Sequence, residues 1–215
     1  MRKRISSLQY ISQGENEVAH LCHIQNALEA RCDWIQLRMK GYDLEKLEYA
    51  AGKAKALCDR FGAKLIINDY VHIARLVGAD GVHLGLNDTS VAEARAILGT
   101  KAIIGGTANT FDDITQRVAE EVDYLGLGPF RFTKTKSNLS PILGIEGYQQ
   151  LLTRMKVAMM DLPVIAIGGI QLSDLSALAE AGIYGVALSG AINKSENPKE
   201  MIKEIHLILD AAMRI

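Results

Sequence analysis

The chain has 215 residues, of which 48% are hydrophobic and 23% charged, and its formal net charge at pH 7 is −1. This length suits one α/β domain, and the lack of excess Lys and Arg argues against nucleic acid as the main partner, because few counterions would be displaced from phosphates. No run approaches the roughly 18–20 apolar residues that a membrane span needs, so no membrane association is expected.

The cysteines and the N-terminus predict a cytoplasmic location. Cys22, Cys32 and Cys58 are odd in number and form no CxxC pair, which favours small apolar fillers in a reducing compartment over a disulfide framework. The first residues, MRKRISSLQYISQ, begin basic but have only a short apolar stretch and no small-residue cleavage site. They therefore do not form a convincing signal peptide.

Eight short apolar runs, rich in Val, Ile and Leu, recur along the chain with amphipathic segments between them. Continuous apolar runs are typical of parallel strands that are covered on both faces. The predicted strands are residues 8–12, 34–38, 64–68, 81–85, 102–106, 124–128, 164–169 and 185–190.

The segments between these runs predict helices, because they carry start and stop signals as well as an apolar face. The expected N-caps are Asp43, Ser90 and Ser173. The glycines expected at or just beyond the helix ends are Gly62, Gly99 and Gly182. In the last helix the side chains expected to face the body of the protein are Met201, Ile202, Ile205, Ile208 and Leu209.

Eight strand–helix units predict a closed (β/α)8 TIM barrel, formed as a single domain by residues 1–215. The alternative is an open doubly wound sheet, which binds ligands where the strand order reverses. No GxGxxG motif follows the first predicted strand, and polar residues follow nearly every strand rather than two of them. The barrel is therefore favoured, with its active-site groups at the C-terminal ends of the strands.

Charged side chains at these strand ends predict a site for a pyrophosphate. Gln36, Arg38 and Lys40 alternate after the second strand, so all three point to one side of an extended segment. Asp69 and Asp88 follow the third and fourth strands, and two carboxylates in one cavity repel each other unless a cation lies between them. Mg²⁺ prefers one or two carboxylates with waters and phosphate oxygens, so it is the expected cofactor.

A second anion site is expected where the seventh and eighth strands end. Gly168–Gly169 and Ser189–Gly190 stand there, and barrels often bind phosphate at this place through backbone N–H groups. The long segment GPFRFTKTKSNLSPILG, residues 128–144, follows the sixth strand and carries two threonines and two lysines. Structureless loops of this length inside compact domains are usually functional or disordered.

Each of these residue types also has an ordinary structural interpretation. A single Asp after a strand, such as Asp69 or Asp88, is as often a helix N-cap as a ligand, and Lys134 is favoured as a solvated loop residue. His83 lies inside an apolar run, which favours a hydrogen-bonded strand histidine over a catalytic one. The histidines in helical patterns, expected on the surface, are His20, His23, His72 and His206.

In their order and combination, the motifs resemble those of the thiamine phosphate synthase family over nearly the full chain. IQLRMK, residues 35–40, resembles that family's QxRxK segment, and residues 65–88 resemble its signature from strand three to strand four. GPFRFTKTK, residues 128–136, resembles its GPxxxTxTK loop. Its phosphate-binding end is matched by PVIAIGGI, residues 163–170, and GVALSGAI, residues 185–192.

The resemblance implies a transferase that joins hydroxymethylpyrimidine diphosphate to a thiazole monophosphate, giving thiamine phosphate and pyrophosphate. The catalytic residues implied are Lys136, Arg38, Lys40 and Thr107. Gln36 would contact the pyrimidine, and the pyrophosphate would be held by Arg38, Lys40, Asn68 and Lys136. The thiazole phosphate would be bound by Thr133, Thr135, Gly168, Gly169, Ser189 and Gly190. Asp69 and Asp88 would bind Mg²⁺, and residues 137–143 would form a mobile lid.

Some positions depart from the family pattern, although none of them removes a charged group that the chemistry requires. These positions are Met39, Leu86, Gly106, Thr107, Phe132 and Ser189. Two alternatives stay open: a thiazole tautomerase-like paralogue, whose base would be His83, and a non-catalytic binder of thiazole or thiamine phosphate. Neither would need both the carboxylate pair and the full Lys/Arg set. The oligomeric state is also open, a homo-oligomer being one outcome.

Overall fold

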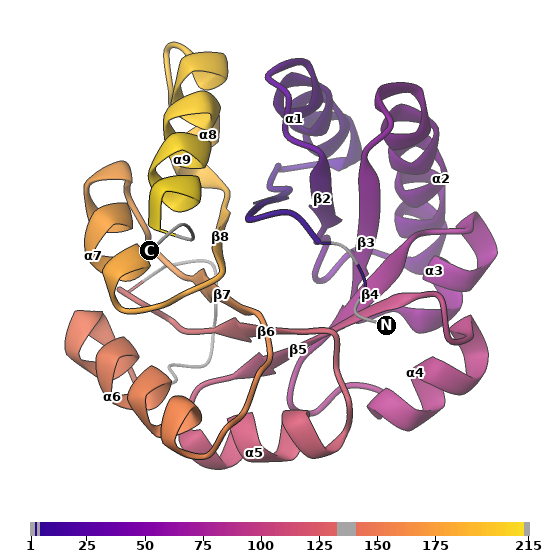
Figure 1. The fold of residues 1–215 in the computed structure, drawn as a ribbon. Coiled ribbons are helices and arrows are strands. Elements are labelled where there is room, and N and C mark those ends of the chain that lie inside the picture. Colours follow the sequence, from indigo (N-terminus) through magenta and orange to yellow (C-terminus); the bar gives the residue numbers. More distant parts are fainter. Residues whose placement is uncertain (1–2, 4, 133–140, 213–215) are drawn as a thin grey trace.

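The computed structural model describes residue 3 and the ranges 5–132 and 141–212, and these form a closed barrel of parallel strands (Figure 1). Each strand pairs with the next in chain order, and β8 pairs with β1. The strands are β1 (Leu8–Ile11), β2 (Trp34–Leu37), β3 (Lys64–Asn68), β4 (Gly81–Leu84), β5 (Ile103–Ala108), β6 (Tyr124–Leu127), β7 (Val164–Ile167) and β8 (Gly185–Leu188). The predicted barrel and all eight predicted strands are confirmed.

The helices surround the barrel as an outer ring (Figure 1). Among the described residues they are α1 (Glu17–Glu29), α2 (Leu44–Phe61), α3 (Val71–Val77), α4 (Val91–Leu98), α5 (Phe111–Ala119), α6 (Gly144–Val157), α7 (Leu175–Glu180), α8 (Gly190–Asn193) and α9 (Pro198–Ala212). A short 3-10 helix, η1 (Leu172–Asp174), precedes α7. Within this part of the chain, no helix is both long and apolar enough to cross a membrane.

Two of the three predicted N-caps are confirmed. The Asp43 side chain accepts a hydrogen bond from the backbone N–H of Lys46 at 2.9 Å, and Ser90 caps α4 in the same way. Ser173 is wrong, because it lies inside η1 rather than at the start of a helix. The carboxylate of Asp174 accepts the backbone N–H of Gln171 instead, at 2.8 Å. A carboxylate is the stronger acceptor, so it determines where this segment begins to turn.

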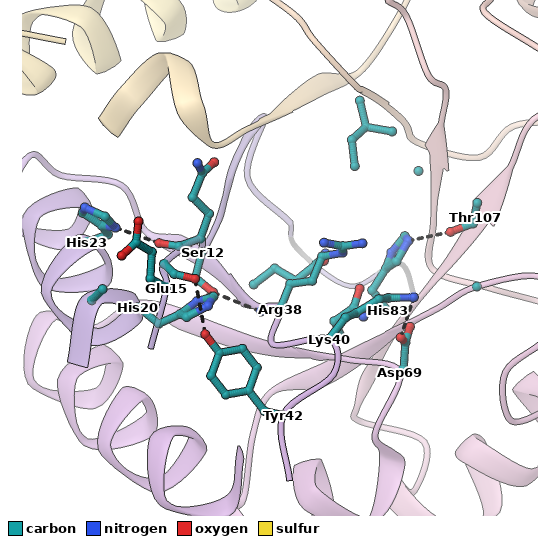
Figure 2. A pocket seen from close by; sticks show the side chains of 18 of the residues that line it. Ser12, Glu15, His20, His23, Arg38, Lys40, Tyr42, Asp69, His83 and Thr107 are labelled. Atoms are coloured by element: carbon teal, nitrogen blue, oxygen red, sulfur yellow. Dashed lines mark hydrogen bonds and ion pairs between the residues drawn. The ribbon is translucent and has the colours of Figure 1, made fainter. Parts of the chain in front are cut away.

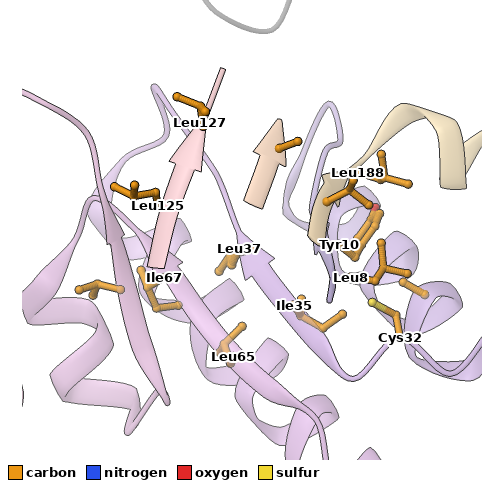
Figure 3. Close-up of a cluster of buried hydrophobic side chains, with 14 of the residues drawn as sticks. Leu8, Tyr10, Cys32, Ile35, Leu37, Leu65, Ile67, Leu125, Leu127 and Leu188 are labelled. Carbon is orange, nitrogen blue, oxygen red and sulfur yellow. The ribbon is translucent and has the colours of Figure 1, made fainter. Parts of the chain in front are cut away.

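The core has two layers because successive side chains of a strand point to opposite faces. On β2, Ile35 and Leu37 point outward and pack with the helices, in the cluster drawn in Figure 3. Trp34 and Gln36 point into the barrel. Each fully buried aliphatic side chain of the outer layer contributes about 1.5–3 kcal/mol. The barrel interior is itself filled, by Ile5, Ile11, Trp34, Ile66, Ile103, Tyr124, Ile165 and Ala187.

Two strands begin at glycines because another backbone passes very close. A Cβ added at Gly81, the first residue of β4, would lie 1.9 Å from the carbonyl oxygen of Ile103 on β5. At Gly185, the first residue of β8, it would lie 2.1 Å from the carbonyl oxygen of Ser7. These glycines therefore let neighbouring strands approach at the N-terminal end of the barrel, opposite the end where the polar residues gather.

Candidate active site

A cavity of about 970 Å³ opens at the C-terminal ends of the strands (Figure 2). Its walls come from the ends of seven strands and from the loops that follow them. The lining residues on which the site depends are Ser12, Gln13, His20, Gln36, Arg38, Lys40, Asn68, Asp69, His83, Thr107 and Asn109. This is the rim at which the sequence predicted the active-site groups.

The QxRxK segment contributes three side chains to the cavity, as its alternation predicts. Gln36, Arg38 and Lys40 all line it. The Lys40 Nζ atom lies 2.9 Å from the Oδ2 atom of Asp69. Burial lowers the pKa of Arg38 below its ordinary value, and the neighbouring Asp69 carboxylate offsets part of that effect. Positive charge is thus held next to the carboxylates, which suits a polyanionic ligand.

Asp69 and Asp88 lie side by side, with their carboxyl groups in hydrogen-bond contact. Burial and the hydrogen bond with Asp88 raise the pKa of Asp69 to about 6, although Lys40 acts in the opposite direction. Asp88 Oδ2 also accepts the backbone N–H of Gly85 at 2.7 Å. Neither carboxylate caps a helix, since the N-cap residue of α3 is Tyr70 and that of α4 is Ser90. The interpretation of these two residues as N-caps is therefore wrong.

The backbone holds Asp69 in a conformation that is unusual for a residue with a side chain. Its φ of 65° lies in the left-handed region, which costs roughly 1 kcal/mol or more outside glycine. The backbone N–H of Asp69 donates to the carbonyl oxygen of His83 at 2.9 Å, which fixes the chain in this turn. The turn directs the Asp69 side chain into the cavity and toward Asp88.

Asn68, at the end of β3, presents an unpaired donor. Its side chain is buried and lines the cavity, and its Nδ2 atom has no hydrogen-bond partner among the described residues. An unpaired buried amide costs about 1–3 kcal/mol, and a ligand that brings an acceptor atom recovers that free energy. The position therefore indicates a ligand with an acceptor atom beside the carboxylate pair.

His83 is hydrogen-bonded through both ring nitrogens, as predicted for a strand histidine. Its Nε2 atom lies 3.0 Å from the Thr107 hydroxyl, and its Nδ1 atom lies 3.1 Å from the Tyr124 hydroxyl. Thr107 lies on β5 and lines the cavity with His83, whereas Tyr124 is fully buried on β6. The Thr107 hydroxyl at the cavity is thus held by His83, which is in turn hydrogen-bonded to the buried Tyr124.

The predicted phosphate-binding glycines are not among the residues that line this cavity. Gly168 and Gly169 both have positive φ, 99° and 68°, so the turn after β7 requires glycine. The Ser189 hydroxyl donates to the Oε1 atom of Gln13 at 2.8 Å, which places Ser189 and Gly190 beside the cavity wall. Their role in binding phosphate stays a prediction.

The segment 133–140 lies outside the described residues. It holds Thr133, Thr135 and Lys136, and it also holds most of the predicted lid. The structure therefore does not test where these side chains lie or whether this loop closes over ligands. Phe132, the last described residue before the segment, is exposed.

The loop after β1 also lines the cavity, and the sequence analysis missed it. Residues 12–16, SQGEN, line one end of the cavity together with His20 and His23 from α1 (Figure 2). The prediction that His20 lies on the surface is wrong: it is buried, and its Nδ1 atom is 2.8 Å from the Ser12 hydroxyl. His23 Nδ1 lies 2.7 Å from the carbonyl oxygen of Gln13. Polar residues that follow a barrel strand are expected at the active site, and this expectation applied to SQGEN would have predicted the loop.

His20 and Ser12 support the segment that carries Arg38. The Ser12 hydroxyl accepts the backbone N–H of Arg38 at 3.0 Å, while the ring of His20 stacks edge-on with Tyr42 at 5.8 Å. Tyr42 in turn donates its hydroxyl to the carbonyl oxygen of Gly14. These contacts join the loops after β1 and β2 into one wall of the cavity.

His20 is expected to lower the free energy of unfolding as the pH is lowered from 6.5 to about 4, whereas Asp69, whose pKa is raised to about 6, acts in the opposite direction. Burial, followed by repulsion from His23 and Arg38, lowers the pKa of His20 from 6.5 to about 4. Between these values only the unfolded chain binds the proton, so stability increases with pH and the contribution is complete above pH 6.5. At roughly 1.4 kcal/mol per pH unit, a fall in pKa from 6.5 to about 4 corresponds to a loss of about 3 kcal/mol. His20→Gln should flatten this slope in urea titrations between pH 4 and 8, and an unchanged slope would contradict the assignment.

The chain is similar to known proteins over nearly its whole length. A family model described as thiamine monophosphate synthase matches residues 9–192. A thiamine-phosphate synthase from Flavobacterium psychrophilum is 49% identical over 201 residues, which cover 94% of this chain and 98% of that protein. One from Phocaeicola vulgatus is 46% identical over 205 residues, which cover 95% and 99%.

A solved structure gives the same fold. A thiamine phosphate pyrophosphorylase from Pyrococcus furiosus matches with a TM-score of 0.80 over 96% of both chains. Its sequence is only 24% identical, so this likeness supports the barrel and not the activity. The family model spans most of the chain, and relatives of nearly equal length match it almost end to end. This chain therefore belongs to the thiamine monophosphate synthase family.

Proposed function

We propose that this chain is a thiamine-phosphate synthase that joins hydroxymethylpyrimidine diphosphate to a thiazole monophosphate. The observation that carries the proposal is that Asp69 lines one cavity with Lys40 and Arg38, and that its carboxyl group contacts that of Asp88. A binding protein or an isomerase would not need carboxylates and cations together. A cavity of about 970 Å³ also has room for two small ligands at once.

The cationic side chains act on the leaving pyrophosphate. The bond between the pyrimidine methylene carbon and the diphosphate oxygen breaks, and its electron pair leaves with pyrophosphate. Arg38 and Lys40 donate to the phosphate oxygens, and the unpaired Nδ2 of Asn68 adds a third donor. Because these groups are already in place, they stabilise the negative charge as it develops without reorganising.

The carboxylate pair fits Mg²⁺. Among the described residues, no three His, Cys, Asp or Glu side chains gather into a metal site, and the carboxylates that contact each other at the cavity are those of Asp69 and Asp88. This suits a hard cation that completes its shell with water and phosphate oxygens. Asp69 and Asp88 would hold the ion, which would neutralise charge on the pyrophosphate when bound.

Gln36 and Thr107 hold the pyrimidine so that the two rings are aligned. The electron-rich aminopyrimidine stabilises the cation left by pyrophosphate, and the thiazole nitrogen then forms the new carbon–nitrogen bond. No general base is required for these steps. The protein's contribution is alignment of the rings and exclusion of water.

The remaining assignments rest on the resemblance. Lys136 completes the pyrophosphate contacts, while the thiazole phosphate is bound by Thr133, Thr135, Gly168, Gly169, Ser189 and Gly190. Residues 1–215 act as one domain in the cytoplasm. Gel filtration with light scattering would decide between a monomer and a homo-oligomer.

Incubation of the purified protein with both substrates and Mg²⁺ is expected to give thiamine phosphate and pyrophosphate in equal amounts. Chelation with EDTA should abolish the product, and excess Mg²⁺ should restore it, because Asp69 and Asp88 would hold the ion that neutralises charge on the leaving pyrophosphate. Tight binding of thiazole phosphate without any product would identify a binder. Isomerisation of the thiazole alone would identify a tautomerase.

A further inference from the structure

A chain of hydrogen bonds crosses the barrel interior beneath the cavity. Gln36 Nε2 donates to Gln9 Oε1 at 3.0 Å, and Gln9 Nε2 donates to the Tyr124 hydroxyl at 3.3 Å. That hydroxyl lies 3.1 Å from His83 Nδ1, and His83 Nε2 lies 3.0 Å from the Thr107 hydroxyl. Gln36 and Thr107, the two ends, line the cavity, whereas Gln9 and Tyr124 are buried and do not.

The order of donors and acceptors gives this chain a direction. Burial raises the pKa of Tyr124 above its ordinary value, so the hydroxyl keeps its single proton. Because its oxygen already accepts from Gln9, that proton points to His83 Nδ1. The His83 ring is then protonated on Nε2 and donates to the oxygen of Thr107. These steps leave the Thr107 proton and the Gln36 Oε1 atom to face the cavity.

Two glycines make the room for this chain. A Cβ added at Gly105 would lie 2.1 Å from the Cζ atom of Tyr124. One added at Gly126 would lie 2.7 Å from the Cε1 atom of His83. Gly105 and Tyr124 are register partners across β5 and β6, so the ring packs directly against a position without a side chain. The backbone is therefore built around the two rings.

We propose that Tyr124 is a positioning residue that acts through Gln9 and His83 to present one acceptor, on Gln36, and one donor, on Thr107, to the substrate ring. The identity of that ring rests on the function proposed above. A 4-aminopyrimidine offers the complementary pair, an amino N–H and a ring nitrogen acceptor. A 4-oxopyrimidine offers the reverse, a carbonyl oxygen and a ring N–H. This series of hydrogen bonds thus determines which pyrimidine is accepted, although Tyr124 itself does not contact the substrate ring.

The first test compares Tyr124→Phe with Tyr184→Phe. Tyr184 packs on the same interior cluster, but its hydroxyl donates to the carbonyl oxygen of Ile5 at the N-terminal end of the barrel. The preference for the 4-amino over the 4-oxo diphosphate, measured as a ratio of kcat/KM values, should fall about tenfold in Tyr124→Phe. It should not change in Tyr184→Phe. Equal ratios in both variants and the parent would overturn the proposal.

A second test does not depend on turnover. Nitrogen NMR of labelled wild-type protein should show His83 protonated on Nε2, and Tyr124→Phe should shift the ring toward the other tautomer. A wild-type ring protonated on Nδ1 would overturn the proposal even in an active enzyme. If the parent makes no thiamine phosphate, the proposed function fails, and the His83 tautomer still decides on the direction of the chain. Should Tyr124→Phe not fold, Gln9→Met breaks the same chain and should shift the tautomer likewise.

Discussion

Replacing Asp69 by Asn is expected to lower the kcat for thiamine phosphate formation by about 10²–10³-fold. The substitution removes one of the two carboxylates that would hold Mg²⁺, and it leaves Lys40 without its partner at 2.9 Å. Asn tolerates the left-handed backbone that Asp69 adopts, so the fold should be kept. The loss should therefore appear in turnover rather than in stability, and it should be measured with both substrates saturating.

Asp59→Asn is the matched control for this change. Asp59 is an exposed residue near the end of α2, and its carboxylate pairs with Lys55 on the same helix. The same chemical change there should leave kcat within about twofold, because Asp59 does not line the cavity and its exposed ion pair contributes little to stability. Turnover of Asp69→Asn near that of the parent, at any Mg²⁺ concentration, would remove the carboxylate pair from the mechanism.

Gly81→Ala and Gly52→Ala are expected to change the free energy of unfolding in opposite directions. The new Cβ at Gly81 would meet the carbonyl oxygen, carbonyl carbon and Cα of Ile103, which are backbone atoms that cannot move without separating β4 from β5. The loss should be about 3 kcal/mol or more. Gly52 lies within α2 with nothing within 4 Å of its added Cβ, so alanine there should gain roughly 0.5–1 kcal/mol.

Urea denaturation of the two variants measures this difference directly. Midpoints should move in opposite directions while the slope stays constant, as expected when only stability changes. A Gly81→Ala midpoint equal to that of the parent would mean that β4 and β5 separate easily. The close approach of the two strands would then not be the reason for glycine at position 81.

The sequence predicted the fold well because the barrel depends on local signals. A parallel strand that is covered on both faces must be apolar throughout, so each strand was visible as a short run. The Asp43 and Ser90 caps were equally local, because each carries its own acceptor three residues before the N–H that it caps. Ser173 failed because Asp174 stands next to it and competes for the same backbone.

The site was predictable only in part. Strand ends meet on one rim, so the sequence alone predicted that Gln36, Arg38, Lys40 and Asp69 lie together. His20 could not be placed at the site in this way. The spacing of apolar residues in α1 shows which helix face turns toward the barrel, but it does not show which loop covers that face. The path from Gln36 to Thr107 also depends on strand register, since Gly105 must lie opposite Tyr124.

Asn68 and Asp69 are consecutive residues, and each carries an energetic cost to folding. Asn68 holds a buried amide nitrogen with no hydrogen-bond partner in the described part of the chain, and Asp69 holds a strained backbone. Selection for thermal resistance alone would replace these two positions first, since a smaller side chain at Asn68 or glycine at Asp69 would relieve the cost. Stability and turnover therefore oppose each other at one short segment, and directed evolution for robustness would have to hold that segment fixed.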